Sequence, residues 1–382
     1  MGTVSRADTA ISVTSLEKSF SNEQVLRGVD FDVAPSEFCV VVGPSGSGKS
    51  TLLKCIAGLV PFDAGSIHLD GRAVDEVDVE DRELGYVFQD FEERLFPHMS
   101  VAENVAFGLR QRENPPSASE VDARIDEMLD LLSIPETRDN TPSELSGGQQ
   151  QRVELARQLI RECDVMLLDD PLADLDYKLQ KRMELEMRRI HDDLGSTFVY
   201  VTHNQDQALK LADKLVVVNQ GMIEQIGTPE EVYAEPETAF VGRFIGDTNP
   251  LLGDVVRTEG SNVVVDTPVG EIHAAPRENT PEVGTEVIVL VRPEDLTLGA
   301  DATGCDNRFS VSVEDRTYTG ELTEFTVSLG DDVEEFQVVR DGNVPREAVG
   351  KRTTIGWDAD EGVAYDTLSV VDTVTVEDLM EV

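Results

Sequence analysis

The sequence is short of positive charge. Lysine and arginine together number 32 against 75 aspartate and glutamate residues, which gives a formal net charge of −43 at pH 7. Because binding of nucleic-acid phosphates requires clustered basic side chains, this balance argues against a nucleic-acid partner. The acidic residues are spread among regular apolar segments rather than gathered in a tail, so the composition does not indicate disorder.

Lysine is especially scarce, with eight residues in a chain of 382. The simplest interpretation of the excess acid is a solvated surface. A surface this acidic repels itself in dilute buffer, and it is better tolerated where the Debye length shrinks to about 3 Å, near 1 M salt. We therefore hypothesise a halophilic, cytoplasmic source.

Cysteine and long apolar runs are also scarce. Cys39, Cys55, Cys163 and Cys305 are scattered and form no CxxC pair, which predicts reduced thiols rather than a disulfide framework. The N-terminus has no basic stretch followed by an apolar one, and the longest apolar runs are far shorter than the ~18–20 residues of a membrane span. We expect a cytosolic protein, or one held at a membrane by a partner.

The sequence does contain an α/β pattern, from residue 10 to about 245. Short β-branched runs, such as EFCVVVG, DVMLLDD and STFVYVTH, alternate with helical stretches at 178–193 and 205–212. Fully apolar strands separated by helices predict a mostly parallel sheet covered on both faces. Three helical patterns without an intervening strand predict a helical insertion at about residues 90–162.

The pattern changes after FIGDTNPLLG, residues 244–253. Alternating strands with turn residues at short spacing follow, as in SNVVVDTPVGEIHAA and TEVIVLVRPEDLTL. This arrangement predicts an all-β domain, either a small barrel or a sandwich. We therefore expect two domains, 1–245 and 246–382, in agreement with the chain length.

The stretch GPSGSGKST, residues 43–51, matches G-x-x-x-x-G-K-[ST] and lies between an apolar strand and a helical pattern. Glycines let backbone N–H groups surround phosphates, and the helix N-terminus adds positive potential. Lys49 would contact the β- and γ-phosphates, and Ser50 would supply an oxygen to Mg²⁺. The expected phosphate-binding residues are Gly43, Ser45, Gly46, Gly48, Lys49, Ser50 and Thr51.

A second apolar strand pattern, residues 165–168, ends in two carboxylates that need a partner if they are buried. In P-loop proteins a strand beside the first ends in a carboxylate that holds Mg²⁺, and Asp169 fits that role. An ATPase also needs a group that orients or deprotonates water. Asp170 is placed for this, the alternative being that it only caps the following turn.

The stretch LSGGQQQR, residues 145–152, follows the P-loop motif in the order and spacing that resemble the nucleotide-binding subunits of ABC transporters. The resemblance implies an α/β P-loop ATPase domain with a helical insertion, which works as a dimer. Ser146, Gly147, Gly148 and Gln149 of one copy would close over the ATP held by the P-loop of the other. One chain has one P-loop and one signature, so two complete sites need two chains.

The resemblance implies roles for further residues. Gln89 in YVFQD corresponds to the Q-loop glutamine, a ligand of Mg²⁺ and water that senses the transmembrane partner. His203 corresponds to the switch histidine that contacts the γ-phosphate, and PLADLD resembles the D-loop, which ends at Asp176. Phe20 stands where an aromatic ring stacks on adenine, with Val25 nearby, although a lone aromatic is more often a core residue.

Two positions depart from the family pattern. A glutamate usually occupies the place of Asp170, and Ala173 replaces the serine usual in the D-loop. Aspartate is one methylene shorter, and a misplacement of about 1 Å can cost on the order of 10²-fold in rate. We expect slow but real ATPase activity; a regulator that binds nucleotide without turnover is the alternative.

The C-terminal half resembles the oligonucleotide-binding-like regulatory (TOBE) domain of importer subunits, through VRPEDL at 291–296 and the bridge segment 221–246. Importers in this group carry sugar, polyamine, iron, sulfate or thiamine. Residues 175–209 are similar to polyamine-importer ATPases, and 317–330 suit polyamine or iron(III) importers better than sugar importers. Since function depends on sites rather than folds, this domain is expected to stabilise the dimer or regulate it, not to bind nucleic acid.

The resemblance thus implies the energy-coupling subunit of an importer, with ATP and Mg²⁺ as cofactors, peripheral on the cytoplasmic face of the cell membrane. Its partners would be a second copy of itself, two transmembrane permease subunits and, indirectly, an extracellular solute-binding protein. Polyamine is the favoured solute, with sugar, iron(III) or thiamine as alternatives. A soluble ABC ATPase is the other alternative, but those proteins split the two motifs across a coiled coil or carry two ATPase domains in one chain. An exporter subunit would make the VRPEDL domain unusual.

If the acidic surface is an adaptation to salt, folding stability should depend on it. We expect the thermal unfolding midpoint to rise from dilute buffer to about 2 M KCl, because salt screens the repulsion among the carboxylates. Circular dichroism during heating measures the midpoint. Maximal stability in low-salt buffer would contradict the halophile hypothesis.

Overall fold

The structure is a computed structural model, and it describes residues 9–21, 23–89, 95–111, 114–161, 163–173, 177–329, 335–342, 349–371 and 373–381. The chain divides into two compact units, Met1–Glu231 and Val232–Val382. The expected α/β part followed by an all-β part is therefore confirmed.

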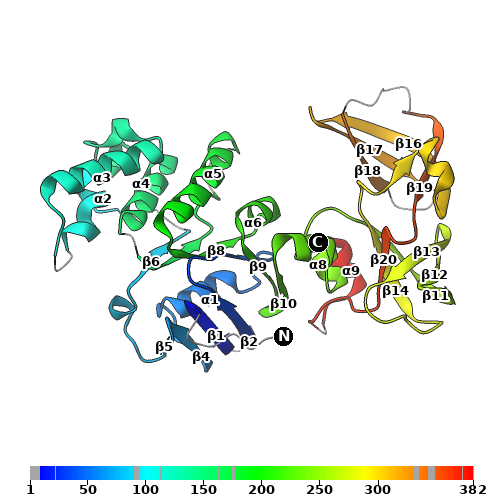
Figure 1. Ribbon diagram of the computed structural model, residues 1–382, viewed down its shortest axis with the longest axis horizontal. Coiled ribbons are helices and arrows are strands. Elements are labelled where there is room, and N and C mark those ends of the chain that lie inside the picture. The colour runs from blue at the N-terminus through cyan, green and yellow to red at the C-terminus, as the bar shows by residue number, and fades with distance from the viewer. Residues whose placement is uncertain are drawn as a thin grey trace. The chain divides into compact units, whose positions relative to one another are not determined.

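The first unit contains two sheets (Figure 1). The six-stranded sheet has the order β10-β9-β3-β8-β7-β6, in which only β10 is antiparallel to its neighbour. Its strands are β3 (Phe38–Val42), β6 (Leu84–Val87), β7 (Val165–Asp169), β8 (Thr197–Thr202), β9 (Lys214–Asn219) and β10 (Met222–Gly227). The apolar runs seen in the sequence thus form the predicted parallel sheet, but the expectation that β7 lies beside β3 is wrong, because β8 lies between them.

The second sheet, which the sequence pattern did not indicate, is antiparallel and has the order β2-β1-β4-β5. Its strands are β1 (Ile11–Phe20), β2 (Glu23–Val33), β4 (Ala64–Leu69) and β5 (Arg72–Ala73). Buried side chains of both sheets and of α1 (Lys49–Ile56) share one core. Burial of apolar surface from two sheets against one helix is what fixes α1, and therefore the loop before it.

The predicted helical insertion consists of α2 (Val101–Arg110), α3 (Ala118–Leu131) and α4 (Gly147–Leu159), which lie together in Figure 1. Each begins with a capping box, in which Ser100, Ser117 or Ser146 exchanges hydrogen bonds with the residue three positions later. The other helices of this unit are α5 (Tyr177–Leu194) and α6 (Gln205–Leu211), and 3₁₀ turns lie at η2 (Val79–Asp81), η3 (Pro135–Thr137) and η4 (Pro142–Glu144).

The second unit contains a closed barrel of order β11-β12-β13-β20-β14 and a five-stranded sheet of order β15-β19-β16-β17-β18. The barrel strands are β11 (Asn249–Glu259), β12 (Asn262–Thr267), β13 (Gly270–Pro276), β14 (Glu286–Val291) and β20 (Gly362–Tyr365). The sheet strands are β15 (Thr297–Leu298), β16 (Asn307–Tyr318), β17 (Leu322–Ser328), β18 (Glu335–Asp341) and β19 (Arg352–Trp357). The remaining elements are α7 (Pro229–Ala234), α8 (Ala239–Phe244), η5 (Asp301–Gly304) and α9 (Val376–Glu381).

The division between the units falls before α8, N-terminal of the expected boundary at 245/246. Ala239 and Phe240 donate backbone hydrogen bonds to Thr367 and Leu368. The guanidinium of Arg292, in the VRPEDL motif, donates to the carbonyl oxygens of Ile245 at 2.8 Å and Asp247 at 3.1 Å. These bonds tie the bridge segment to the barrel, which gives the VRPEDL arginine a structural role.

Cys39 and Cys55 are buried thiols in the core of the first unit, and burial raises the pKa of the Cys39 thiol to about 12. All four cysteines are free, as expected, but Cys163 and Cys305 are only partly buried, so the expectation of core positions is met by Cys39 and Cys55. Among the described residues, no helix combines the length and the apolar character needed to cross a membrane.

Candidate functional site

The GPSGSGKST loop joins β3 to α1, as the motif predicts. A Cβ on Gly43 would overlap the carbonyl oxygen of Val218, and a Cβ on Gly48, whose φ is +99°, would lie 2.8 Å from the carbonyl oxygen of Val25. Ser45 and Gly46 are exposed at the tip of the loop. The backbone of neighbouring strands thus approaches the loop so closely that only glycine fits, and the loop is held as a cradle at the N-terminus of α1.

Lys49 is a buried cation in this cradle. Its ammonium donates to the carbonyl oxygens of Gly43 at 2.8 Å and Pro44 at 2.7 Å. Burial lowers the pKa of Lys49 to about 8, against the opposing attraction of Asp170 and Asp169. Its ammonium also donates to the Ser47 hydroxyl at 3.2 Å. A cation that is desolvated and bonded only to neutral oxygens is suited to receive a polyanion such as triphosphate.

Asp169 ends β7 and is 2 % exposed. Its Oδ1 accepts a hydrogen bond from the Ser50 hydroxyl at 2.7 Å, and its Oδ2 accepts one from the Tyr86 hydroxyl at 3.1 Å. The structure therefore joins two of the three residues expected to hold Mg²⁺, Ser50 and Asp169. Tyr86 was not foreseen, because a tyrosine in an apolar strand carries no signal of its partner.

Asp170 follows in the left-handed backbone region, with φ +45°. Its Oδ2 lies 2.6 Å from Nδ1 of His203, and its Oδ1 accepts from the Thr202 hydroxyl at 3.2 Å. Burial raises the pKa of Asp170 above its usual value, although His203 and Thr202 oppose this. From the sequence, Asp170 and His203 were both expected to act near the γ-phosphate, without a contact between them. The structure brings them into direct contact.

Parallel strand pairing puts these residues at one edge of the sheet. Val42 pairs with Thr202, and Asp169 pairs with Val201. In parallel sheets the carboxyl ends of the strands meet at the same edge, where ligands bind. Gln89, which is exposed, follows β6 at this edge, since Val87 pairs with Leu168.

The signature residues lie at the start of α4. Ser146 is the N-cap of the helix, with Gln149 as its capping-box partner, and both Ser146 and Gly147 are exposed. A helix N-terminus with small residues is open to phosphate. The Gln151 side chain, one turn later, donates to the carbonyl oxygen of Pro171 at 2.9 Å, which links this helix to the strand that carries the two aspartates.

The remaining residues predicted for the site make no described contact with Lys49 or the two aspartates. Phe20, at the end of β1, is 46 % exposed, with the Lys18 ammonium 5.2 Å from its ring centroid. Val25 lies against Gly48, and Thr51 is half-buried in the first turn of α1. Asp176 lies outside the described residues.

The residues fit a magnesium nucleotide. Among the described residues there is no group of three His, Cys, Asp or Glu side chains that could hold a metal by itself. The expected Mg²⁺ ligands are instead one hydroxyl, one amide and one carboxylate, from Ser50, Gln89 and Asp169, which leaves positions for phosphate oxygens and water. The hydrogen bond between Ser50 and Asp169 places the hydroxyl and the carboxylate of this set together. The glycine cradle provides backbone N–H groups for the phosphates.

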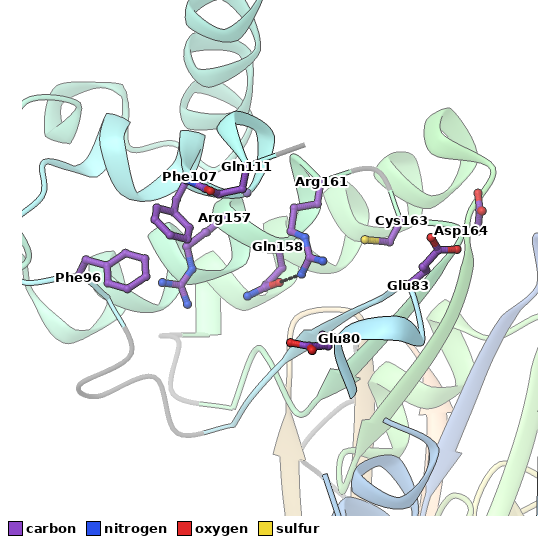
Figure 2. Close-up of a pocket in the computed structure, with 11 residues that line it drawn as sticks. Glu80, Glu83, Phe96, Phe107, Gln111, Arg157, Gln158, Arg161, Cys163 and Asp164 are labelled. Carbon is purple, nitrogen blue, oxygen red and sulfur yellow. Dashed lines mark hydrogen bonds between the residues drawn. The ribbon is translucent and has the colours of Figure 1, made fainter. Parts of the chain in front are cut away.

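A groove of about 760 Å³ lies between the helical insertion and the strands of the first unit (Figure 2). Phe96 and Phe107 form one wall, with ring centroids 4.6 Å apart, and Arg157 lies over Phe96 at 5.4 Å. Arg161 also lines this wall. Carboxylates line the opposite wall, from Glu80, Glu83 and Asp164.

Comparison with known families agrees with this geometry. The family described as ABC transporter matches residues 26–173, and the TOBE domain family matches residues 289–364. The chain is 42% identical over 340 residues to the spermidine/putrescine import ATP-binding protein PotA of Nostoc sp., with 88% of each chain covered. It is 37% identical to PotA of Aliivibrio fischeri, over 92% of this chain and 95% of that one.

Solved structures resemble the first part of the chain. A post-hydrolysis dimer of the ATP-binding cassette MJ0796 bound to ADP and Pi has 27% identity and a TM-score of 0.53, and it covers 57% of this chain and 98% of that one. CbiO1 from Clostridium perfringens, part of the ABC transporter complex cbiONQ, has 30% identity and a TM-score of 0.54, over 60% and 92%.

The chain therefore belongs to the ATP-binding subunits of ABC transporters, of the importer type with a C-terminal TOBE domain. Members of this family bind ATP, hydrolyse it to drive transport, dimerise and work with membrane permease partners. The sequence-based expectation of an ATPase of this family is confirmed.

Lys49 should take up a proton when ATP binds. With a pKa of about 8, about half of the Lys49 side chains are neutral at pH 8, and the phosphates favour the ammonium form and raise this pKa. Isothermal titration calorimetry in buffers of different ionisation enthalpy should detect up to about half a proton per ATP at pH 8, and less at pH 6.5. Lys49→Arg is the matched control, since arginine stays charged throughout; equal proton uptake by this variant would contradict the assignment.

Proposed function

We propose that this protein is the energy-coupling subunit of a polyamine importer, with Asp170 as the general base of ATP hydrolysis. The observation that carries the base assignment is the contact of Asp170 with His203, beside the P-loop lysine. The printed names of the relatives, spermidine/putrescine import ATP-binding proteins, support the solute class.

In the proposed reaction, water attacks the γ-phosphorus of ATP, the bond to the β-phosphate oxygen breaks, and Asp170 accepts the proton released by the water. An ionised carboxylate only accepts hydrogen bonds, so Nδ1 of His203 carries the proton in their contact. The His203 side chain is 58% exposed, so the rest of its ring is open to a γ-phosphate. Lys49 holds the β- and γ-phosphates.

Bound Mg²⁺ would offset the negative charge on the phosphates, with Ser50, Asp169 and Gln89 as its protein ligands. The exposed Ser146 and Gly147 would cover the γ-phosphate held by the second copy of the chain. ATP then binds the closed dimer more tightly than the open one, and shifts the population toward closure. Loss of the γ-phosphate removes its contacts with His203 and the opposite signature, and the dimer reopens.

The groove of Figure 2 is the proposed docking site of a permease segment. One wall comes from the helical insertion, and the other comes from η2 and from the residues just before β6 and β7, so a segment held there responds when these parts move. The aromatic and arginine wall suits an apolar segment with a carboxylate, and the acidic wall suits a basic residue. The two permeases would place the protein at the cytoplasmic face of the membrane, and a solute-binding protein would deliver the polyamine outside.

Substitution of Asp170 tests the base assignment. Asp170→Asn should lower kcat by about 10²- to 10⁴-fold, since general bases contribute this much, whereas Asp170→Glu should match or exceed the wild type. Hydrolysis in molar KCl at saturating ATP measures both. Because burial raises the pKa of Asp170, kcat should begin to fall at a higher pH on acidification than for an ordinary exposed carboxylate. An Asn variant as fast as wild type would show that Asp170 is not the base.

Uptake tests the solute. The subunit, reconstituted with its permease partners in inverted vesicles or expressed with them in cells that lack polyamine uptake, should support uptake of labelled spermidine or putrescine. Maltose, iron(III) and thiamine serve as matched solutes. Uptake of one of these and not of polyamine would replace the proposed solute while leaving the ATPase assignment intact.

Charge reversal tests the groove. Arg161→Glu should lower the amount of permease that co-purifies with the subunit by about tenfold, because the docking wall then repels a carboxylate. Arg257→Glu, at an exposed site in the second unit, is the matched control. Equal recovery of permease with both variants would exclude the wall that contains Arg161 as the docking site of the permease.

A further inference from the structure

The hydroxyl of Thr202 lies at the centre of a buried hydrogen-bond network next to Asp170. Thr202 ends β8 and is fully buried. Its Oγ1 lies 3.2 Å from Oδ1 of Asp170, 3.2 Å from Oε1 of Gln207 and 3.0 Å from the backbone nitrogen of Asn204. The Tyr200 hydroxyl lies 3.0 Å from the same Gln207 oxygen.

The protons of this network determine how Gln207 is oriented. The Thr202 hydroxyl has one proton but faces two acceptor oxygens, those of Asp170 and Gln207. Meanwhile Nε2 of Gln207 is buried without a hydrogen-bond partner among the described residues. An amide oxygen and nitrogen have nearly the same shape, so their assignment follows from the network.

Turning the Gln207 amide by half a rotation gives Nε2 partners and leaves the Thr202 hydroxyl with one acceptor, although it also removes the Gln207 oxygen as the acceptor of the Tyr200 hydroxyl. Nε2 then donates to the Tyr200 and Thr202 oxygens, and the buried N–H group without a partner is replaced by a carbonyl oxygen, which is the better tolerated case. The Thr202 oxygen accepts from Gln207 and from the backbone of Asn204. Its single proton is left for Asp170.

We propose that Thr202, oriented by Gln207, is a positioning residue that holds the Asp170 carboxylate in the plane required for hydrolysis. This inference rests on the proposed role of Asp170 as the base. Thr202 does not touch the nucleotide in this scheme, and it acts only through Asp170.

The aspartate needs this second anchor because its terminal torsion is broad. The backbone of Asp170 is fixed, since its N–H donates to the carbonyl oxygen of Val201 at 2.9 Å. The carboxylate plane is not fixed by the backbone, because χ2 of aspartate has no sharp staggered minima. The hydrogen bond from His203 to Oδ2 alone still lets the carboxylate rotate about that oxygen. The hydrogen bond from Thr202 to Oδ1 prevents this rotation.

The anchor is specific to the short side chain. A glutamate at position 170 would carry its carboxylate one methylene farther and away from the place where Oδ1 meets the Thr202 hydroxyl. The Thr202 bond is therefore the device by which this site uses aspartate in place of the glutamate usual in the family.

The test combines two hydroxyl variants with two carboxylates. Thr202→Val keeps the shape and removes the hydroxyl, and Thr202→Ser keeps the hydroxyl. In the Asp170 protein, Thr202→Val should lower kcat about 10- to 100-fold with the KM for ATP within about twofold, and Thr202→Ser should retain kcat within about threefold. In the Asp170→Glu protein, Thr202→Val should change kcat by about threefold or less.

This comparison separates positioning from folding. Thr202→Val also removes the acceptor of the Asn204 N–H, but that loss is common to both backgrounds and cancels. The urea unfolding midpoint and the ATP dissociation constant of each variant give readouts independent of turnover, and both should be alike for the Val variants of the two backgrounds. If Thr202→Val does not fold, Thr202→Ala replaces it with the same expectations.

Several results would overturn the inference. Wild-type kcat in Thr202→Val, an equal loss in the Asp170→Glu background, or failure of Thr202→Ser to rescue would each exclude positioning through Asp170. These outcomes are distinct from failure of the proposed base: that failure is full activity of Asp170→Asn, which is measured separately.

Discussion

The parallel pairing of β3 with β8 and of β8 with β7 is the constraint on which the rest of the site depends. Each strand is buried along its whole length, and the polar residues of the site, Asp169 and Thr202, stand where the strands end. In a parallel sheet those ends share one edge. The phosphate loop, the two aspartates and the Thr202–His203 pair therefore meet, although they are spread over about 160 residues of sequence.

Two adjacent carboxylates at the end of a buried strand would be costly without partners. In the structure each of the two carboxylates has its own hydrogen-bond partners. Asp169 accepts from Ser50 and Tyr86, and Asp170 is held by Thr202 and His203. These directed donors take the place of water, and the site is left with Lys49 as a desolvated cation facing the two anions.

The arginine wall of the groove and the signature share helix α4. Ser146 caps the start of α4, and Arg157 in its last turn faces the groove beside Phe96. Gln151 joins the middle of this helix to Pro171, directly after the aspartates. If the groove holds a permease segment as proposed, this helix is a physical route between that segment and the loop that follows the two aspartates.

The sequence by itself determined the phosphate loop, the signature, the aspartate pair and the order of the α/β and all-β parts, because each depends on local spacing or on apolar periodicity. The expected roles of His203 and Gln89 came from the family resemblance. Only the tertiary structure decided that Tyr86 bonds Asp169, that Thr202 and His203 both hold Asp170, and that Arg292 ties the bridge segment to the barrel. It also supplied the antiparallel sheet β2-β1-β4-β5. The physical reason is that these contacts join residues far apart in sequence, and a hydroxyl or a guanidinium carries no local sign of the acceptor it will meet.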